Sequence, residues 1–480
     1  MKKYLPKVLI GIFLVCIALL LYTNLGRDAL FDWAEGLYAE LGRQVGATGD
    51  VYTTYWNGAP WLEKPPGIAW VSAIGIALLG PSAHGARLLM PLFAIYVLYM
   101  VYRIGTHLGG YKHGLLAAGI LAGFNLFLGR TRGVNTDMPL LAAITTTILF
   151  LLENRPAWLV ALSIFGGVWF KGIAGLLSVI IALPLFFTKS KTYLLSTISY
   201  LLVFIVPWHL YAYLKHGQAF LTPYLYEQVL QRATAQIEFH FEPRWYYFSY
   251  LYENLGLGVL LVAGLGGLSL TQRFFTAHLK DRWLYATLLW WVLAPLAIFT
   301  LAKTRLFWYI LPIYPALSLL IAEIIGRFSI TKVQQRVLLI VTIGVLAQGL
   351  LTASRSVEID KKTAVMPDRL IVARELSALS PHELLILVPE SERLAEALLP
   401  EVAKLTSSFR YGVMPSVVFY YQGPVRFFYD VDKFGSVWSE TEDPLAVVST
   451  ADRKLIPVNH TITATTPTYI GIKKGTYALS

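Results

Sequence analysis

The chain has 480 residues, of which 56% are hydrophobic and only 14% are charged, and its mean hydropathy is +0.57. These values lie far from those of a soluble globular protein and indicate a polytopic membrane protein. The net charge of +11 does not indicate a nucleic-acid partner, because much of it lies in short loops between apolar runs. Cys16 is the only cysteine, which excludes an intrachain disulfide.

Apolar runs long enough to cross a bilayer recur from the N-terminus to about residue 353. We predict about eleven α-helical spans, over residues 8–24, 86–106, 114–130, 136–152, 157–170, 172–188, 193–214, 255–270, 284–301, 306–325 and 337–353. The first follows a basic start without a small-residue cleavage site, which predicts an uncleaved anchor. The apolar segment 66–80 is shorter and is bounded by Pro65-Pro66 and Gly80-Pro81, so we predict a re-entrant or interfacial helix in the first outer loop.

The positions of Lys and Arg predict the orientation of the chain. With the basic N-terminus in the cytoplasm, the alternation of spans leaves these residues in cytoplasmic loops: Lys112, Arg155, Lys189, Lys191, Arg273, Lys280, Arg282, Arg327, Lys332 and Arg336. That distribution agrees with the excess of basic residues in the cytoplasmic loops of membrane proteins. An odd number of spans then places the C-terminus on the outer side of the cytoplasmic (inner) membrane.

Residues 354–480 have ordinary polarity, so we predict a membrane domain over 1–353 and an extracytoplasmic domain over 354–480. The tail alternates strand-like runs with helical patterns, which is typical of a small α/β domain. The strand-like runs are LLILV, SVVFYY, VRFFY, LAVVS and TYIGIKK, and the helical patterns cover 367–379 and 390–404. We expect this domain to be a lid or a recognition module.

Six cations do not follow the cytoplasmic bias. They lie at the outer ends of predicted spans or in outer loops: Lys64, Arg130, Arg132, Lys171, Lys303 and Arg305. Any one of them is explained as well by a long side chain that reaches the lipid headgroups. Six such residues on one face favour a shared anionic ligand at the outer leaflet, since a cation placed in a membrane segment usually has a functional reason.

Acidic residues and a histidine lie in the same outer loops. They are Asp32, Glu35, Glu40 and Glu63 in the first outer loop, Asp137 at the start of the span 136–152, and Glu238, His240 and Glu242 in the long loop 215–254. The alternative interpretation is that these residues are solvated, with Glu35 and Glu40 on the polar face of a short amphipathic helix. In the tail, Asp430-Val431-Asp432 has the D-x-D form of a metal site, but no glycine-rich phosphate loop accompanies this short triplet.

Several of these segments occur in a familiar order. FDWAEGLYAE is followed by EKPP, NTDMP, FKGIAG, HFEPRWYY and AKTRLFWYILPIYPAL. In this order and spacing they resemble the protein O-mannosyltransferase superfamily of integral-membrane (GT-C) glycosyltransferases. Within it the chain is most similar to the bacterial lipid A aminoarabinose transferase-like branch. The resemblance covers about residues 1 to 330, and EKPP with the K-x-x-x-x-x-YILP segment carries most of its specificity.

The resemblance implies transfer of a sugar from a polyprenyl (undecaprenyl) phosphate donor to an acceptor on the outer face, with inversion at the anomeric carbon. Glu63 and His240 match the metal-associated positions of the family, and Lys64 matches its donor-phosphate lysine. Lys303 and Tyr309 match the segment that approaches the lipid phosphate, and Asp137 matches the outer-loop Asp at the end of a span. The metal is Mg, Mn or Zn on this interpretation, and the acceptor is a lipid A-like lipid, a protein or a polysaccharide.

The first outer loop departs from the family pattern. The family carries an adjacent Asp-Glu pair there, and its Asp is the base or orients the acceptor. This chain has Ala34-Glu35, with Asp32 two residues earlier. Either Asp32 or Glu35 has taken the role, or the acceptor class differs, for example a phosphate that needs little help from a base, or the protein is impaired in transfer.

The chemistry itself requires cations near the donor. The sugar leaves a phosphate anion behind, so Lys64, Arg305 and a cation held by Glu63 and His240 would stabilise the developing charge. Glu63 is alternatively an ion-pair partner of Arg130 or Arg132. The rival function is a transporter or flippase for a lipid-linked sugar, but such proteins usually contain internal repeats, and this chain has no obvious one.

Overall fold

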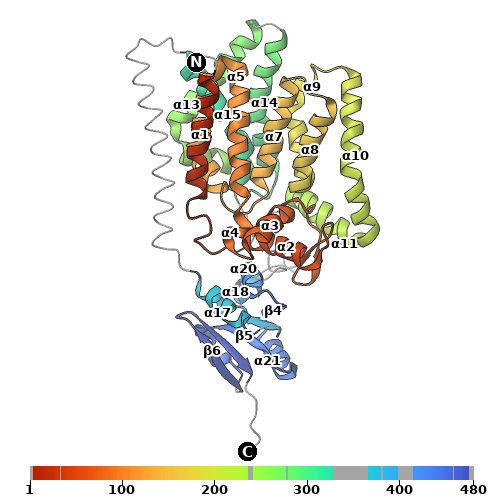
Figure 1. Cartoon of the computed structure of the whole chain (residues 1–480), viewed down its shortest axis with the longest axis vertical. Helices are drawn as coiled ribbons and strands as arrows, with labels where there is room; N and C mark the ends of the chain where they lie inside the picture. Colours follow the sequence, from red (N-terminus) through yellow and green to blue (C-terminus); the bar gives the residue numbers. More distant parts are fainter. Residues whose placement is uncertain are drawn as a thin grey trace, which may run out of the picture. The chain divides into compact units, whose positions relative to one another are not determined.

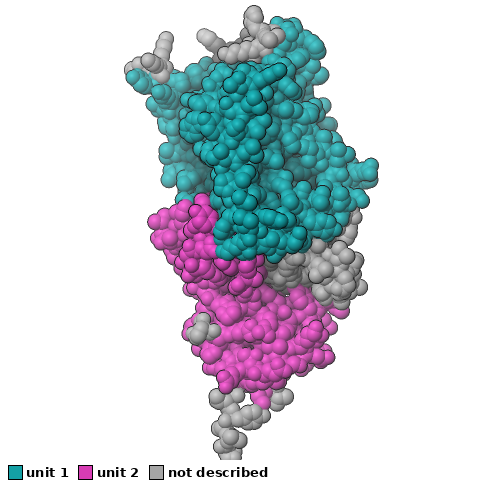
Figure 2. Space-filling model, turned by 90° about the vertical axis from the view of Figure 1, so that its right-hand side faces the viewer, with its two compact units in different colours: residues 1–24, 62–68, 89–359 teal, residues 25–61, 69–88, 360–480 magenta. Residues whose placement is uncertain are grey.

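The computed structural model describes residues 4–32, 34–235, 242–276, 279–327, 366–379, 382–397, 414–457 and 459–474. These residues form two compact units, coloured separately in Figure 2. Unit 1 consists of residues 1–24, 62–68 and 89–359, and unit 2 of residues 25–61, 69–88 and 360–480. Unit 2 therefore combines much of the first outer loop with the C-terminal tail. The predicted domain boundary at residue 354 lies outside the described residues.

Unit 1 is helical, with long helices that run alongside one another (Figure 1). Its elements are α1 (Leu5–Tyr22), α5 (Met90–Ala122), α6 (Asn125–Arg130), α7 (Asp137–Leu152), α8 (Ala157–Lys171), η1 (Gly172–Leu176), α9 (Leu177–Phe186), α10 (Lys191–His216), α11 (Gln218–Leu221), η2 (Thr222–Gln231), α12 (Arg232–Thr234), α13 (Tyr246–Thr276), α14 (Leu279–Leu301), η3 (Phe307–Ile313) and α15 (Tyr314–Arg327). All predicted spans before residue 330 fall on these helical segments.

In the described part of the chain, seven helical stretches are long and apolar enough to cross a membrane. They are Leu5–Tyr22, Ala83–Ala122, Ala157–Phe186, Lys191–His216, Tyr246–Thr276, Arg282–Leu301 and Phe307–Gly326. Asp137–Leu152 and Gly67–Leu79 are shorter apolar helices, and the predicted span 337–353 lies outside the described residues. A polytopic helical membrane fold is confirmed, and the number of eleven crossings stays a prediction.

The stretch Ala83–Ala122 contains the predicted span 86–106 and the start of the predicted span 114–130, because α5 reverses direction between them. Gly109 and Gly110 have non-helical backbone angles in its middle, and Gly110 has φ +76°, which favours glycine. A Cβ on Gly105 would lie 2.7 Å from the Cα of Gly114. Nine residues of straight helix would separate these positions by about 13 Å. The two halves of α5 are therefore an antiparallel hairpin.

The N-terminal part of unit 2 contains short elements. They are α2 (Ala34–Thr48), the antiparallel pair β1 (Thr54–Trp56) and β2 (Ala59–Trp61), most of α3 (Gly67–Leu79), and α4 (Ala83–Arg87). The helix predicted over 66–80 corresponds to α3, whose 13 residues are few for a crossing.

The tail forms a five-stranded sheet in the order β4-β3-β5-β7-β6. Its elements are α17 (Asp368–Ser377), β3 (Leu384–Leu387), α18 (Glu390–Ala397), α20 (Pro415–Tyr421), β4 (Val425–Phe428), α21 (Val431–Glu440), β5 (Leu445–Ser449), η5 (Thr450–Leu455), β6 (His460–Thr465) and β7 (Tyr469–Lys474). β4, β3 and β5 are parallel, and β7 is antiparallel to β5 and β6. The predicted small α/β domain is confirmed.

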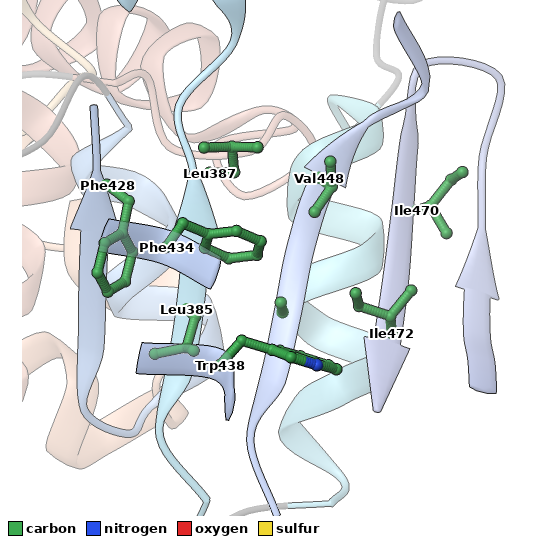
Figure 3. Packing of buried hydrophobic residues seen from close by; sticks show 9 residues of the cluster. Leu385, Leu387, Phe428, Phe434, Trp438, Val448, Ile470 and Ile472 are labelled. Atoms are coloured by element: carbon green, nitrogen blue, oxygen red, sulfur yellow. The ribbon is translucent and has the colours of Figure 1, made fainter. Parts of the chain in front are cut away.

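One face of this sheet carries a hydrophobic core. Figure 3 shows Phe434 and Trp438 of α21 lying across Leu385, Phe428 and the neighbouring strands, with a helix on the opposite face. The alternating positions Leu385 and Leu387 point to this core, as the two-residue period of a strand requires.

Two sequence-based interpretations of the tail change in the structure. The predicted strand SVVFYY is wrong, because residues 415–421 form the helix α20, with Pro415 at its first turn. Proline is well suited to the first turn of a helix, and a short, wholly apolar run does not distinguish a buried helix from a strand. Asp430 of the D-x-D triplet is the N-cap of α21 and accepts hydrogen bonds from the main-chain N–H groups of Asp432 and Lys433 at 2.9 and 3.1 Å. This cap explains Asp430 structurally.

Candidate functional site

The EKPP motif lies in unit 1, directly before α3. Lys64 and Glu63 are both partly buried, with 15% and 11% of their side chains exposed. Their Nζ and Oε2 atoms are 4.0 Å apart, which is the outer limit of an ion pair. The closer partner of the Glu63 carboxylate is Gln228, whose Nε2 donates to Oε2 at 2.6 Å.

Gln228 belongs to η2, a ten-residue π-helix. Its Oε1 accepts from Nε of Arg232 at 3.1 Å, and Nη1 of Arg232 donates to the hydroxyl of Tyr309 at 3.1 Å. Tyr309 lies in the YILP segment, within η3. A continuous chain of contacts therefore joins EKPP to YILP, although 246 residues separate Glu63 from Tyr309 in the sequence.

A second cluster in unit 1 surrounds Asp137, the first residue of α7. The Asp137 side chain is buried, and its two oxygens accept separately from Arg130 and Lys171. The side chain of Asn135 accepts from the main-chain N–H groups of Asp137 and Met138, both at 3.0 Å, and so holds the start of the helix.

The Asp137 cluster and the EKPP chain meet at Tyr309 of YILP, and the cluster also contacts Trp308, the residue before this motif. The ammonium of Lys171 lies 5.6 Å from the ring centroid of Tyr309, and the guanidinium of Arg130 lies 5.0 Å from that of Trp308. Both distances are within the range of cation–π contacts. We call these connected residues the polar network: Glu63, Lys64, Arg130, Asp137, Lys171, Gln228, Arg232, Trp308 and Tyr309.

The remaining predicted cations lie beside this network with structural contacts. Lys303 is exposed, and its main-chain N–H donates to the carbonyl of Ala233. Arg305 is buried and donates to the carbonyls of Glu242 and Thr300 at 2.6 and 3.0 Å. Arg132 donates to the carbonyl of Thr23 at 2.8 Å. The contacts of Arg305 favour an anchoring role over the predicted phosphate contact.

Asp32 and Glu35 belong to unit 2, and both carboxylates are engaged there. Asp32 accepts from the main chain and hydroxyl of Ser416 and from Arg369, residues of the tail. Glu35 forms a two-pronged ion pair with Arg87, at 2.7 and 2.8 Å. Both sets of contacts are those of structural anchors.

The amphipathic-helix interpretation of the first outer loop is wrong. Glu35 and Glu40 are 6% and 0% exposed in α2, so they do not form a polar face. Glu40 is satisfied inside unit 2 by Arg43 and Gln44, which donate to it at 2.7 Å. A buried carboxylate needs such partners, because isolated burial of its charge is costly.

The predicted metal site is not assembled in the described residues. His240 lies outside them, and within them no group of three or more His, Cys, Asp or Glu side chains is placed to hold a metal ion. Glu63 accepts a hydrogen bond from Gln228, and Arg130, its predicted alternative partner, is paired with Asp137.

Gln228, Arg232 and Trp308 were absent from the predicted site. The long segment 215–254 was interpreted as a loop, although TPYLYEQVLQ has a proline near its start and apolar residues at helical spacing. Those signals predict a helix, and a helix brings Gln228 and Arg232 to one side, because they are four residues apart. Nothing in the sequence indicates that this helix is of the π type.

Among the residues that the structure describes, the polar network holds four cations, Lys64, Arg130, Lys171 and Arg232, and two carboxylates, Glu63 and Asp137. Most of these side chains are partly buried, so solvent screens them less than it screens surface charges. An excess of positive charge in such surroundings favours an anion such as a phosphate. The aromatic rings of Trp308 and Tyr309 border Arg130 and Lys171 and add apolar surface beside these cations.

Comparison with known proteins places these features in context. Residues 63–211 match the family model described as dolichyl-phosphate-mannose-protein mannosyltransferase. An undecaprenyl phosphate-α-4-amino-4-deoxy-L-arabinose arabinosyl transferase from Sodalis glossinidius is 30% identical over 352 residues, which are 68% of this chain and 60% of the relative. A second such transferase, from Pseudomonas fluorescens, is 26% identical over 337 residues, covering 66% of this chain and 56% of the relative. The chain spans about three fifths of the length of these relatives.

Solved structures have the same fold. The crystal structure of ArnT from Cupriavidus metallidurans bound to undecaprenyl phosphate has a TM-score of 0.75 and 15% identity, covering 97% of this chain and 98% of that one. The oligosaccharyltransferase AglB from Archaeoglobus fulgidus has a TM-score of 0.55 and 12% identity, covering 94% of this chain and 70% of that one.

Proposed function

The chain belongs to the protein O-mannosyltransferase superfamily of integral-membrane (GT-C) glycosyltransferases, in the lipid A aminoarabinose transferase-like branch, and from this premise we propose that it transfers a sugar from a polyprenyl-phosphate donor to an acceptor. The relatives are named for undecaprenyl phosphate-α-4-amino-4-deoxy-L-arabinose, which is the first donor to test. The reaction takes place at the outer face of the cytoplasmic membrane, with a lipid A-like lipid as the first acceptor to test.

One observation carries this proposal: the polar network gathers four cations around EKPP, Asp137 and YILP. A polyprenyl-phosphate sugar brings one phosphate group and a long apolar tail to its enzyme. The cations suit the phosphate, and the apolar helices of unit 1 suit the tail. A transporter needs phosphate contacts as well, but it does not need a carboxylate held between two cations beside them.

In the proposed reaction the bond between the anomeric carbon and the phosphate oxygen breaks, and the acceptor oxygen bonds to that carbon from the opposite side. The phosphate keeps the electron pair, so its negative charge grows in the transition state. We assign Lys64 to this phosphate, with Arg232 and Lys171 adding positive charge nearby. Cations held in place before the reaction stabilise the transition state without the cost of reorganisation.

A proton must leave the acceptor if the acceptor is a hydroxyl. Asp137 is the predicted catalytic carboxylate that lies within the polar network, whereas Asp32 and Glu35 are engaged by the anchors of unit 2. We therefore propose that Asp137 orients Lys171 and Arg130 and receives the proton when the acceptor is a hydroxyl. If the acceptor is a phosphate, it arrives charged, and the orienting role alone remains.

Replacement of Asp137 by asparagine is expected to lower kcat by about 100-fold and to leave the affinity for undecaprenyl phosphate unchanged or higher. The substitution removes a negative charge, so the remaining cations attract the phosphate at least as well but lose their orientation. Donor cleavage gives kcat, and titration with undecaprenyl phosphate gives Kd. Asp443→Asn, at an exposed ion pair of the tail, is the control. Equal losses of turnover and affinity would count against a direct role of Asp137.

The decisive experiment uses the purified full chain in lipid nanodiscs with radiolabelled undecaprenyl phosphate-4-amino-4-deoxy-L-arabinose. We expect free undecaprenyl phosphate to appear and the label to move to lipid A when lipid A is added. The same protein in sealed vesicles tests the rival function. Movement of the intact donor between leaflets without cleavage of the sugar–phosphate bond would overturn the glycosyltransferase.

The orientation of the chain is a separate proposal, with the N-terminus in the cytoplasm and the tail outside. Ser436 lies on the exposed side of α21, and Cys16 is the only natural cysteine. In a Cys16→Ser background, we expect a membrane-impermeant maleimide to label Ser436→Cys in intact cells. Lys191→Cys, in a loop predicted to be cytoplasmic, should react only after lysis. The opposite pattern would overturn the topology.

A further inference from the structure

The tail and the first outer loop form one compact unit, although most of unit 1 lies between them in the sequence. Unit 2 contains residues 25–61 of the loop together with residues 360–480 of the tail (Figure 2). The described residues of the two segments contact each other at the tip of the β1–β2 hairpin, at the chain before α2, and at α2 itself.

The hairpin is joined to the tail through Asn57. Asn57 and Gly58 form its two-residue turn with φ of +48° and +81°, the left-handed region that Asn-Gly hairpin turns favour. The Asn57 amide donates to the carbonyl of Val425 and accepts from the main-chain N–H of Val425 at 3.0 Å. Val425 begins β4, an edge strand of the sheet. The side chain therefore pairs with this edge as a further peptide group would.

The chain before α2 is held by α20. The main-chain N–H of Leu30 donates to the hydroxyl of Tyr420 at 3.0 Å. Asp32 accepts from the main-chain N–H of Ser416 at 3.1 Å, from the hydroxyl of Ser416, and from Arg369. Ser416 lies in the first turn of α20, where main-chain N–H groups have no partner inside the helix. Asp32 therefore caps α20 from a distant part of the chain.

Helices α2 and α20 approach each other at Gly36. A Cβ on Gly36 would lie 2.8 Å from the main-chain N and Cα atoms of Ser416, so glycine is the residue that permits this approach. Movement of the tail away from the loop would break this packing and would also remove the tail's donors from the Asp32 carboxylate. Loss of hydrogen bonds to a charged group is costly, so we expect the two segments to stay together.

The first outer loop continues into EKPP without a spacer. β2 ends at Trp61, which is buried and packs edge-to-face against Tyr38 of α2, with 6.1 Å between the ring centroids. The next residue, Leu62, is buried in a hydrophobic cluster of unit 1, and Glu63 follows it. A displacement of the hairpin is therefore passed along the chain to EKPP through a single intervening residue.

We propose that the tail is a brace that holds the first outer loop, and through it EKPP, in place, with Asn57, Asp32 and Arg369 as positioning residues. The effect on activity rests on the proposed function, whereas the hold of the tail on the loop does not. A brace stays closed throughout turnover, whereas a lid must open to admit a substrate. Asp32 then acts by holding the loop and is not the base.

Donor cleavage by the full-length protein in nanodiscs tests the effect on activity. Asn57→Gly keeps a residue suited to the turn but removes the amide, and Arg369→Met removes one donor to Asp32. We expect each variant to lower kcat/KM by about 10-fold and the double variant by about 100-fold, the loss that a small misplacement of a site can cause. The control is Phe434→Leu, which loosens the tail core of Figure 3 but leaves the contacts with the loop in place. It should lower the melting temperature and leave kcat/KM unchanged below it.

A cross-link distinguishes a brace from a lid. In the Cys16→Ser background, Asp32→Cys/Arg369→Cys removes the ion pair and offers two thiols that a short, reducible bifunctional thiol reagent can join. We expect low turnover before cross-linking, recovery after it, and low turnover again after reduction. Recovery also shows that the Asp32 carboxylate is not needed as a base. If turnover stays low or falls further once mass spectrometry shows complete cross-linking, the brace is overturned.

Hydrogen exchange tests the hold of the tail on the loop without any substrate. In Asn57→Gly/Arg369→Met, the main-chain amides of α2 and of the β1–β2 hairpin should exchange faster than in the wild type, because local opening costs less. Phe434→Leu should speed exchange in the tail sheet instead. Unchanged exchange of α2 and the hairpin in the double variant would contradict the hold. If the double variant does not fold, Asn57→Asp keeps the turn, cannot donate to Val425, and carries the same expectation.

Failure of the brace and failure of the proposed function have different signatures. If the wild type does not cleave the donor but hydrogen exchange follows the expected pattern, the proposed function fails and the hold on the loop stands. If the wild type cleaves the donor and the double variant cleaves it equally well, the positioning role is overturned and the proposed function stands.

Discussion

Replacement of Lys64 by alanine is expected to lower the rate of donor cleavage by about 1000-fold, which is the upper end of the loss seen when one preorganised charge-stabilising group is removed from an active site. Lys64 is partly buried at the EKPP motif, and its neighbour Glu63 accepts a hydrogen bond from Gln228 at 2.6 Å. We propose that the Lys64 ammonium meets the departing phosphate, whose charge grows in the transition state.

Two further variants sharpen this prediction. Lys64→Arg keeps the charge but changes its shape and reach, so we expect a smaller loss of about 10- to 100-fold. Lys191→Ala removes an exposed lysine at the start of α10 and should leave the rate unchanged. The rate at which free undecaprenyl phosphate is released measures donor cleavage in all three variants, Lys64→Ala, Lys64→Arg and Lys191→Ala. A loss below tenfold in Lys64→Ala would remove Lys64 from the proposed chemistry.

Replacement of Arg87 by leucine is expected to destabilise unit 2 by about 3–5 kcal/mol, the cost of breaking a buried ion pair from one side. Arg87 is 5% exposed and pairs with Glu35 through two nitrogens. It also donates to the carbonyls of Leu25, Asp28 and Ala29. The substitution leaves the Glu35 charge and these carbonyls buried without their common donor.

Thermal unfolding in detergent, followed by circular dichroism, measures this effect. Arg426→Met is the control, because Arg426 makes a similar two-pronged pair with Glu383 at the surface, where such pairs contribute about 0–1 kcal/mol. The double variant Glu35→Gln/Arg87→Met should recover part of the loss, since the uncompensated charge is then absent. Equal melting temperatures for Arg87→Leu and Arg426→Met would show that Arg87 is not an anchor.

Glu35, the ion-pair partner of Arg87, belongs to the altered acidic pair of the first outer loop. The loop carries Ala34-Glu35 where the family has Asp-Glu, and the sequence alone offered Asp32 or Glu35 as replacements for the base. The structure engages Asp32 with Ser416 and Arg369 of the tail, and Glu35 with Arg87. The first outer loop and the tail are thereby joined within unit 2, and of the three predicted catalytic carboxylates, Asp137 is the one that contacts cations of unit 1.

Most of the candidate site could be predicted from the sequence. Lys64, Lys171, Arg130, Asp137 and Tyr309 are all in the polar network, and the first four were recognisable because charges at the edges of apolar spans are costly and few. The pairing among them was not predictable. Glu63 was expected to pair with Arg130 or Arg132 or to bind a metal, yet it accepts a hydrogen bond from the amide of Gln228, 165 residues away.

The apolar runs and the polar tail were enough to predict a polytopic helical membrane protein with a small α/β domain, because the transfer of side chains between water and lipid depends on their type and on the length of each run. The sequence also determined which charged residues stand out from the apolar background. The fold was needed to show that residues 415–421 are a helix, and that Asp32 and Glu35 anchor unit 2. It was also needed to show that the π-helix η2 and the short helix α12 after it bring Gln228 and Arg232 between two distant motifs. These outcomes depend on which surfaces meet across the fold, and the free energy of those contacts is not contained in any local stretch of sequence.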